Sequence, residues 1–174
     1  MTRQTDAFVD HLLGLSEDRG ALAALRRGLG QPPGAAPDMY RYVVPWLGPE
    51  RRPEDDDYFI LAALFAMHPS STRDGNMGAH FARAKAQDPN QEAAIERRFA
   101  ALLAAHPDDL PFYLRQAVSF LRSKEIPINW HELMADLRYW DHPKRRVQQK
   151  WARAFWAASQ KPDAAASADA EDEK

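Results

Sequence analysis

The chain of 174 residues contains no cysteine. It therefore has no disulfide framework, no thiolate ligand for a metal and no thiol nucleophile, and this composition suits a reducing cytoplasm. No stretch approaches about eighteen uninterrupted apolar residues, so we expect no membrane-spanning helix. The first residues, MTRQTDAFVD, lack the apolar segment of a secretory signal, and we expect no signal peptide. With 45% hydrophobic residues, the chain can bury a core in one compact domain or two small ones.

Sequence motifs of catalysis are also missing. The chain has no glycine-rich phosphate-binding loop, no dinucleotide-binding fingerprint and no nucleophile elbow. His131-Glu132 begins like a zinc-protease motif, but Ala135 stands where the second histidine ligand belongs. The consecutive acids from Glu54 to Asp57 would point about 100° apart on a helix and cannot converge on one Mg²⁺, so we interpret them as first-turn residues that complement the helix dipole. We therefore expect no catalytic site, no metal, no cofactor and no small-molecule substrate.

What the sequence does contain is helical patterning. Apolar residues recur mostly three and four positions apart, which predicts an all-α fold of two small helical-bundle domains with about eight to nine helices. The stretch 39–47 is interpreted as helix or turn, because Pro45 argues against a central strand despite the aromatic and β-branched residues around it. The other predicted helices cover residues 5–15, a segment after Asp18 that stops near Gly28 and Gly30, then 53–67, 77–86, a segment around 95–103, 108–124, 130–139 and a last helix that begins at Pro143.

The stretch AQDPNQ, around residues 88–91, is the best candidate for a domain boundary. We predict an N-terminal helical domain over residues 1–88 and a C-terminal helical domain over residues 89–161. Residues 162–174 are mostly Ala, Ser, Asp and Glu and have little to bury, so we predict a disordered tail.

Charge is distributed unevenly along the chain. The net charge of −2 combines −4 over residues 1–114, +6 over residues 115–161 and −4 over residues 162–174. No acid occurs between Lys144 and Lys161, in a segment that carries the bases of HPKRRVQQKWARAFW. A near-neutral total therefore hides a basic C-terminal region followed by an acidic tail.

The last predicted helix separates its aromatic and basic side chains. On a helical wheel, Val147, Trp151, Ala154 and Phe155 form one apolar stripe, and Arg146, Lys150 and Arg153 form a ridge on the far side. Trp156 lies on the flank, where we expect it to pack against a neighbouring helix rather than stack on a base. A solvated helix usually mixes acids with bases, so the absence of acids favours a phosphate-binding ridge over a merely soluble face.

Other predicted helices also carry arginines. Arg115 and Arg122 are seven residues apart and share a helix face, Arg26 and Arg27 lie outside a leucine stripe, and Arg83 follows the loop that ends at Asn76. Several such helices facing one way would form a groove that follows a nucleic-acid backbone, whereas helices facing different ways would only keep the protein soluble. The sequence leaves both possibilities open.

Five motifs occur in order along the chain: ALRRGLG, MYRYVVPWLG, NMGAHFARA, YLRQAVSFLRS and INWHELMADLRYWDHPKRRVQQKWARAFW. Their order and spacing resemble the small subunit of the type I-E CRISPR Cascade surveillance complex, the CasB family, over nearly the whole chain from about Phe8 to Trp156. The acidic tail after Lys161 matches nothing in that family.

The resemblance implies a cytoplasmic, all-α subunit without a catalytic site that serves antiviral defence. Its partners would be the backbone and large subunits of Cascade, a second copy of itself, the guide RNA and the target DNA. It would bind nucleic acid independently of sequence and stabilise the R-loop with its displaced non-target strand. The positions that match the basic sites of the family are Arg26, Arg27, Arg83, Arg115, Arg122, Lys144, Arg145 and Arg146.

Two alternatives stay open from the residues alone. Residues 130–140, the short turn at 141–143 and the basic last helix could form a helix-turn-helix DNA-binding transcriptional regulator, which would be a dimer with a preference for certain duplex sequences. The chain could also be an unrelated helical enzyme or a pure interaction protein.

Overall fold

The computed structural model describes residues 3–157, and within this range the chain is helical and contains no strand. The nine α-helices of this range are α1 (Arg3–Gly14), α2 (Arg19–Arg26), α3 (Tyr40–Val43), α4 (Asp55–Met67), α5 (Met77–Gln87), α6 (Glu92–Leu103), α7 (Leu110–Ser123), α8 (Trp130–Leu137) and α9 (Arg146–Ala157). Four short 3-10 helices accompany them: η1 (Pro37–Met39), η2 (Val44–Trp46), η3 (Pro89–Gln91) and η4 (Pro107–Asp109). The predicted all-α fold is confirmed. None of the described helices is long and apolar enough to cross a membrane.

Local sequence signals set many of the helix boundaries. The carboxylate of Asp18 accepts the N–H of Ala21 at 2.9 Å and caps α2 as predicted. Asn76 caps α5, and Asn129 caps α8, through the same kind of hydrogen bond. The stretch 39–47 is helical, as η1, α3 and η2 follow one another there. The acids at 55–57 lie in the first turn of α4, as expected.

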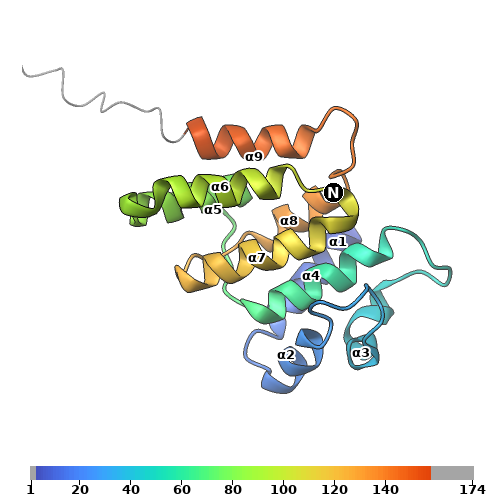
Figure 1. Ribbon diagram of the computed structural model, residues 1–174. Helices are drawn as coiled ribbons and strands as arrows, with labels where there is room; N and C mark the ends of the chain where they lie inside the picture. Colours follow the sequence, from blue (N-terminus) through green and yellow to red (C-terminus); the bar gives the residue numbers. More distant parts are fainter. Residues whose placement is uncertain (1–2, 158–174) are drawn as a thin grey trace, which may run out of the picture.

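Helix α4 is the centre of the packing. Its second half is buried on all sides, from Leu61 to Ala66, and it contacts α2, α7 and α8. Figure 1 shows α4 and α7 crossing the middle of the molecule, with α2 and α3 on one side and α5, α6 and α9 on the other. One hydrophobic cluster extends through these helices, from Phe8 in α1 to Phe155 in α9.

The core spans both predicted domains. Its buried residues come from either side of residue 88, and α5 packs along α6 and α9 across that position. The division at residue 88 itself stays a prediction. The predicted tail, residues 162–174, lies outside the described residues.

The last helix begins later than predicted, at Arg146 instead of Pro143. Arg145 adopts a left-handed backbone conformation with φ of 48°, which a helix cannot include. His142 closes a turn here, because its Nδ1 accepts the N–H of Lys144 at 3.1 Å and its carbonyl accepts the N–H of Arg145 at 2.7 Å. Lys144 and Arg145 therefore precede the helix and do not belong to its wheel.

Candidate nucleic-acid interface

The eight predicted nucleic-acid-binding residues are all exposed. They are Arg26, Arg27, Arg83, Arg115, Arg122, Lys144, Arg145 and Arg146. They come from four helices and the turn before α9, and they do not form a single compact patch. Their local surroundings differ, which separates cations that are free to meet phosphate from cations that already bind other parts of the protein.

Arg26 and Arg27 lie at the end of α2. The Nε–H of Arg26 donates to the carbonyl of Ala66 at 2.8 Å, which satisfies one of the unpaired carbonyls in the last turn of α4. Arg27 forms an exposed ion pair with Asp38 at 2.9 Å. Both arginines therefore already bind another part of the protein. Arg27 is the more neutralised of the two, because its partner is a carboxylate.

Arg115 and Arg122 share the outer face of α7, as their spacing predicts. Neither makes an ion pair with any described residue. Arg115 reaches the loop after α2, because a Cβ at Gly30 would lie only 2.7 Å from its Nη1. Gly30 also has φ of 76°, so glycine suits this position on both counts. The fold thus brings the end of α2 and the outer face of α7 together.

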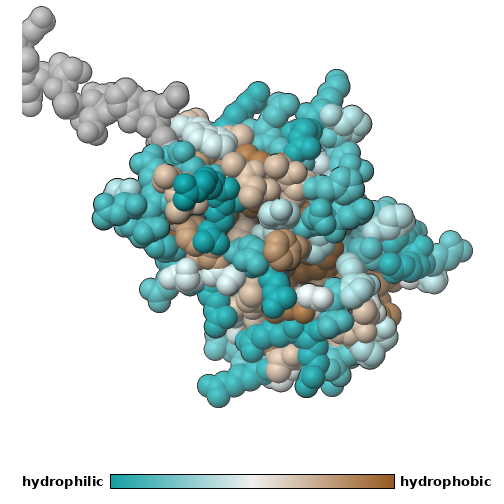
Figure 2. Space-filling model, in the orientation of Figure 1, coloured by the Kyte–Doolittle hydropathy of each residue, from teal (hydrophilic) through white to brown (hydrophobic). Residues whose placement is uncertain are grey.

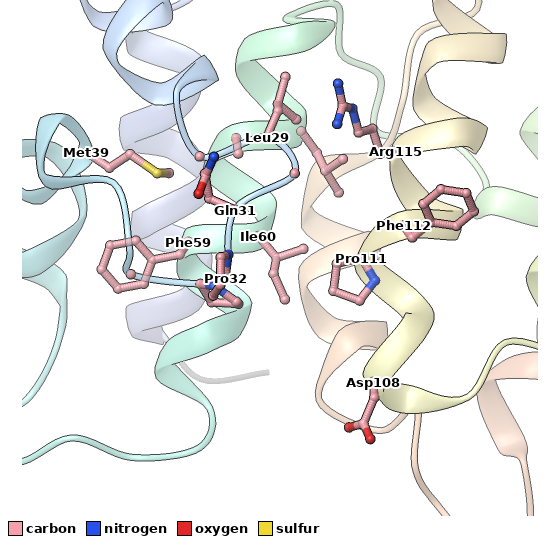
Figure 3. A pocket seen from close by; sticks show the side chains of 16 residues that line it. Leu29, Gln31, Pro32, Met39, Phe59, Ile60, Asp108, Pro111, Phe112 and Arg115 are labelled. Atoms are coloured by element: carbon pink, nitrogen blue, oxygen red, sulfur yellow. The ribbon is translucent and has the colours of Figure 1, made fainter.

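The loop after α2, together with α4 and α7, lines a cleft of about 360 Å³. Figure 3 shows Pro111 and Arg115 of α7 across from Phe59 and Ile60 of α4 and the loop of residues 28–34, with the ring of Phe112 on the outer side of α7 at the rim of the cleft. Phe112 is 61% exposed, although it is a large hydrophobic residue. Its position was available from the sequence, because it falls outside the apolar stripe of α7 one turn before Arg115.

Arg83 lies apart from this group, on α5 beside the second half of α9. It lines a shallow groove together with Lys85, Pro89 and Ala154. Lys85 is paired with Glu92 and Glu96 and lies 4.8 Å from the ring centre of Phe155, so Arg83 is the freer cation of the two.

Lys144, Arg145 and Arg146 cluster at the start of α9. Arg145 donates from Nη2 to the carbonyl of Leu103 at 2.5 Å and so binds the last turn of α6. Lys144 and Arg146 make no ion pair with the part of the chain that the structure describes. These two residues are the free cations of the motif.

The predicted ridge of Arg146, Lys150 and Arg153 is wrong at Lys150. Its ammonium donates to Glu132 at 2.6 Å and to Asp136, both on α8. Asp136 is buried and also accepts the Nε1–H of Trp151 at 2.7 Å. Burial raises the pKa of Asp136, while the hydrogen bonds from Lys150 and Trp151 oppose that rise. The acids that the last helix lacks are therefore supplied by its neighbour.

The apolar stripe of α9 is confirmed at Val147, Trp151 and Phe155, which are buried. The sequence missed Gln148, which is also buried and donates its Nε2–H to the carbonyl of Trp140 at 2.8 Å. Trp156 packs against Phe99 of α6, with ring centres 5.6 Å apart, as expected.

The acids before and within the first turn of α4 serve different partners. Asp55 accepts the backbone N–H of Arg52 at 2.9 Å, and Asp56 pairs with the side chain of Arg51 at 2.8 Å. This agrees with the expectation that they do not converge. Among residues 3–157, no group of three or more His, Asp or Glu is placed to hold a metal ion.

Comparison with known proteins relates this arrangement to one family. The sequence model of "CRISPR-associated protein Cse2" matches residues 21–156. The Cse2 protein of Thermus thermophilus is 38% identical over 158 residues, which cover 88% of this chain and 90% of that protein.

Solved structures agree with the sequence comparison. A Cse2-family protein from Thermus thermophilus has a TM-score of 0.77 at 34% identity, over 90% of this chain and 99% of that one. M. ruber CasB has a TM-score of 0.74 at 33% identity, over 91% and 95% of the two chains. A chain of a CRISPR RNA-guided surveillance complex has a TM-score of 0.78 at 28% identity, over 90% and 93%. The protein therefore belongs to the CRISPR-associated Cse2 family, whose members are also called CasB.

Proposed function

We propose that the chain is the non-catalytic small subunit of a type I-E CRISPR Cascade complex in the cytoplasm. It binds nucleic-acid backbone without reading base sequence and stabilises the R-loop, including the displaced non-target strand, in antiviral defence. Its partners are the backbone and large subunits, a second copy of itself, the guide RNA and the target DNA. Family membership and the likeness to a chain of a surveillance complex support this role. The observation that carries it is the exposure of all eight matched basic residues.

Exposed basic residues are sufficient for a subunit that binds the nucleic-acid backbone without reading bases. Guide–target pairing reads the sequence, so this subunit needs only cations that follow a phosphate backbone. R-loop formation is a nearly balanced exchange of base pairs, and modest extra contacts can tip it. Each phosphate contact also releases counterions, which makes binding steeply dependent on salt.

The ion pairs and hydrogen bonds of the eight residues rank them as candidates for phosphate contacts. The strongest candidates for phosphate contacts have neither an ion pair nor a side-chain hydrogen bond among the described residues, and they are Arg83, Arg115, Arg122, Lys144 and Arg146. Arg26 has no ion pair either, but its Nε–H is bound by the carbonyl of Ala66. Arg27 is partly neutralised by Asp38, and Arg145 is held by Leu103. The helix-turn-helix interpretation gives way to the family assignment.

Reversing the charge of the free cations before α9 tests the proposal. We expect a Lys144→Glu, Arg146→Glu variant to fold normally, since both side chains are exposed, and to weaken R-loop formation by the assembled complex. The salt dependence of R-loop stability should also fall by about one unit of slope for each phosphate that the variant no longer binds. Gel-shift titrations of a target duplex at several salt concentrations measure both.

An Arg19→Glu, Arg97→Glu variant is the matched control, because it makes the same change in net charge at two exposed arginines outside the predicted set. Unchanged R-loop stability at physiological salt, or an equal loss in the control, would refute the role of these cations.

A further inference from the structure

The outer face of α7 combines an aromatic ring with cations. Phe112, Arg115, Gln116, Ser119 and Arg122 are all exposed on this helix, and no acid occurs between Leu110 and Lys124. Arg115 and Arg122 are separated by about 10 Å along the helix axis. Their long side chains can therefore reach phosphates one or two nucleotides apart on one strand. Proteins that hold single strands without sequence preference use this combination of cations and exposed rings.

Phe112 is held in place from one side. Its ring meets the ring of Tyr113 edge to face, with centres 5.3 Å apart, and Tyr113 packs against the hydrophobic core. Such a braced aromatic ring loses little freedom when a flat group stacks on it.

The cleft beside Phe112 is apolar at its base and polar at its ends. Figure 2 shows hydrophobic atoms in a hollow near the centre of this face, where Figure 1 draws α4 and α7. Figure 3 shows Arg115 at one end of the cleft and Asp108 at the other, with Gln31 across from α7. Its volume of about 360 Å³ lies at the lower end of the usual range for small-ligand sites.

We propose that this cleft holds one unstacked nucleobase of a single-stranded nucleic acid, stacked on Phe112, with the adjoining phosphate on Arg115. The site rests on the proposed function, which it deepens by adding a base-stacking contact to the phosphate contacts. The order of charges fixes the orientation. Phosphate is attracted to Arg115 and repelled by Asp108, while the Asp108 carboxylate and the Gln31 amide can meet polar edges of a base.

An apolar side chain of a partner protein is the competing occupant. The surroundings favour the nucleotide, because the face that leads to the cleft carries two cations without an ion pair among the described residues and no acid. Arg122 also continues the line from the cleft along α7, as a phosphate backbone requires.

Binding of the full chain to two single-stranded probes tests the site. One probe is oligothymidine of about twelve nucleotides, and the other is an abasic backbone of equal length. We expect Phe112→Ala to weaken binding to oligothymidine about ten-fold, to leave binding to the abasic backbone unchanged, and to be rescued by Phe112→Trp. Arg115→Ala should weaken binding to both probes. Tyr139→Ala is the matched control, because Tyr139 is 60% exposed but lies outside the cleft, and it should bind both probes normally.

The outcomes separate the two proposals. If the wild-type chain binds both probes in a salt-dependent way but Phe112→Ala has no effect, or weakens both probes equally, the stacking site is wrong and the proposed function stands. If the wild-type chain binds neither probe, both proposals fail. If Phe112→Ala disturbs only assembly with other Cascade subunits, the cleft docks protein and the stacking site is again wrong.

Discussion

Gly78 lies where the backbones of α5 and α9 approach each other closely. A Cβ at this position would come within 1.9 Å of the carbonyl oxygen of Trp151, so any side chain forces the two helices apart. We expect Gly78→Ala to destabilise the fold by about 1–3 kcal/mol or more, as overpacking in a core does. Urea denaturation measures the loss. Gly14→Ala is the control, because a Cβ there meets no atom within 4 Å and should leave stability unchanged or slightly improved. Similar stability of the two variants would contradict the close approach.

The carboxyl group of Asp57 makes the folding stability of the protein depend on pH. Burial raises its pKa to about 6, and Arg138 opposes that rise. The folded state therefore holds the proton more tightly than the unfolded state does. The stability from this proton is present below about pH 4 and is lost as the pH rises towards 6.

An Asp57→Asn variant should then be more stable than the wild type at pH 7, by about 1–2 kcal/mol after allowance for solvent screening, and should gain little at pH 4. Thermal unfolding at the two pH values measures the difference. Asp56→Asn is the control, because Asp56 is paired with Arg51 and its removal should bring no gain at pH 7. An equal gain for Asp57→Asn at both pH values would show that the charge of Asp57 is not the cause.

Helices α8 and α9 are joined by the contacts of Lys150. Its ammonium lies between Glu132 and the buried Asp136, so its removal leaves Asp136 with the indole of Trp151 as its remaining donor. We expect Lys150→Ala to destabilise the protein by about 1–2 kcal/mol, less than a fully buried pair would because the lysine side chain is 42% exposed. Denaturant unfolding checks this.

Arg153 on the same helix is exposed and provides the comparison. Arg153→Ala should change stability by less than about 0.5 kcal/mol. Lys150→Ala should also leave the salt slope of R-loop formation unaltered. If Lys150→Ala leaves stability unchanged but weakens nucleic-acid binding, Lys150 contacts phosphate with Arg146 and Arg153 and the prediction is wrong.

Helices α8 and α9 show which structural features could be predicted from the sequence and which could not. The wheel of α9 placed Val147, Trp151 and Phe155 correctly in the core, because helical periodicity depends only on local spacing. The partners of Lys150 could not be predicted, since they lie on another helix. The start of α9 was also wrong, because the preference of Pro143 for a first turn competes with the turn that His142 closes and with the positive φ of Arg145.

At the scale of the whole molecule, the basic residues occupy separate places. Arg115 lines the cleft beside the loop after α2. Arg83 lies near the second half of α9, and Lys144 and Arg146 lie at the start of α9. The sequence indicated exposure for the arginines that fall outside an apolar stripe, which are Arg26, Arg27, Arg115, Arg122 and Arg146. It could not indicate which of them share a face, since that depends on how the helices pack. Such an arrangement suits a strand that follows the surface better than a compact ligand.

Net charge acts on the whole molecule as well. Residues 162–174 carry −4, and the rest of the chain carries +2. An acidic segment on the same chain competes with nucleic acid for the cations and lowers the attractive potential of the surface. We expect deletion of residues 162–174 to strengthen binding of single-stranded DNA roughly two- to ten-fold at low salt.

The gain should disappear near 1 M salt, where the Debye length is about 3 Å. Fluorescence anisotropy of a labelled oligonucleotide over a salt series measures it. A full-length variant with the five tail acids changed to Asn or Gln separates charge from length, because it keeps the chain and removes the anions. This variant keeps Lys174 and should strengthen binding at low salt at least as much as the deletion does. If the deletion strengthens binding but the neutralised tail does not, the acids of the tail are not the cause. The tail would then weaken binding by occupying space near the arginines.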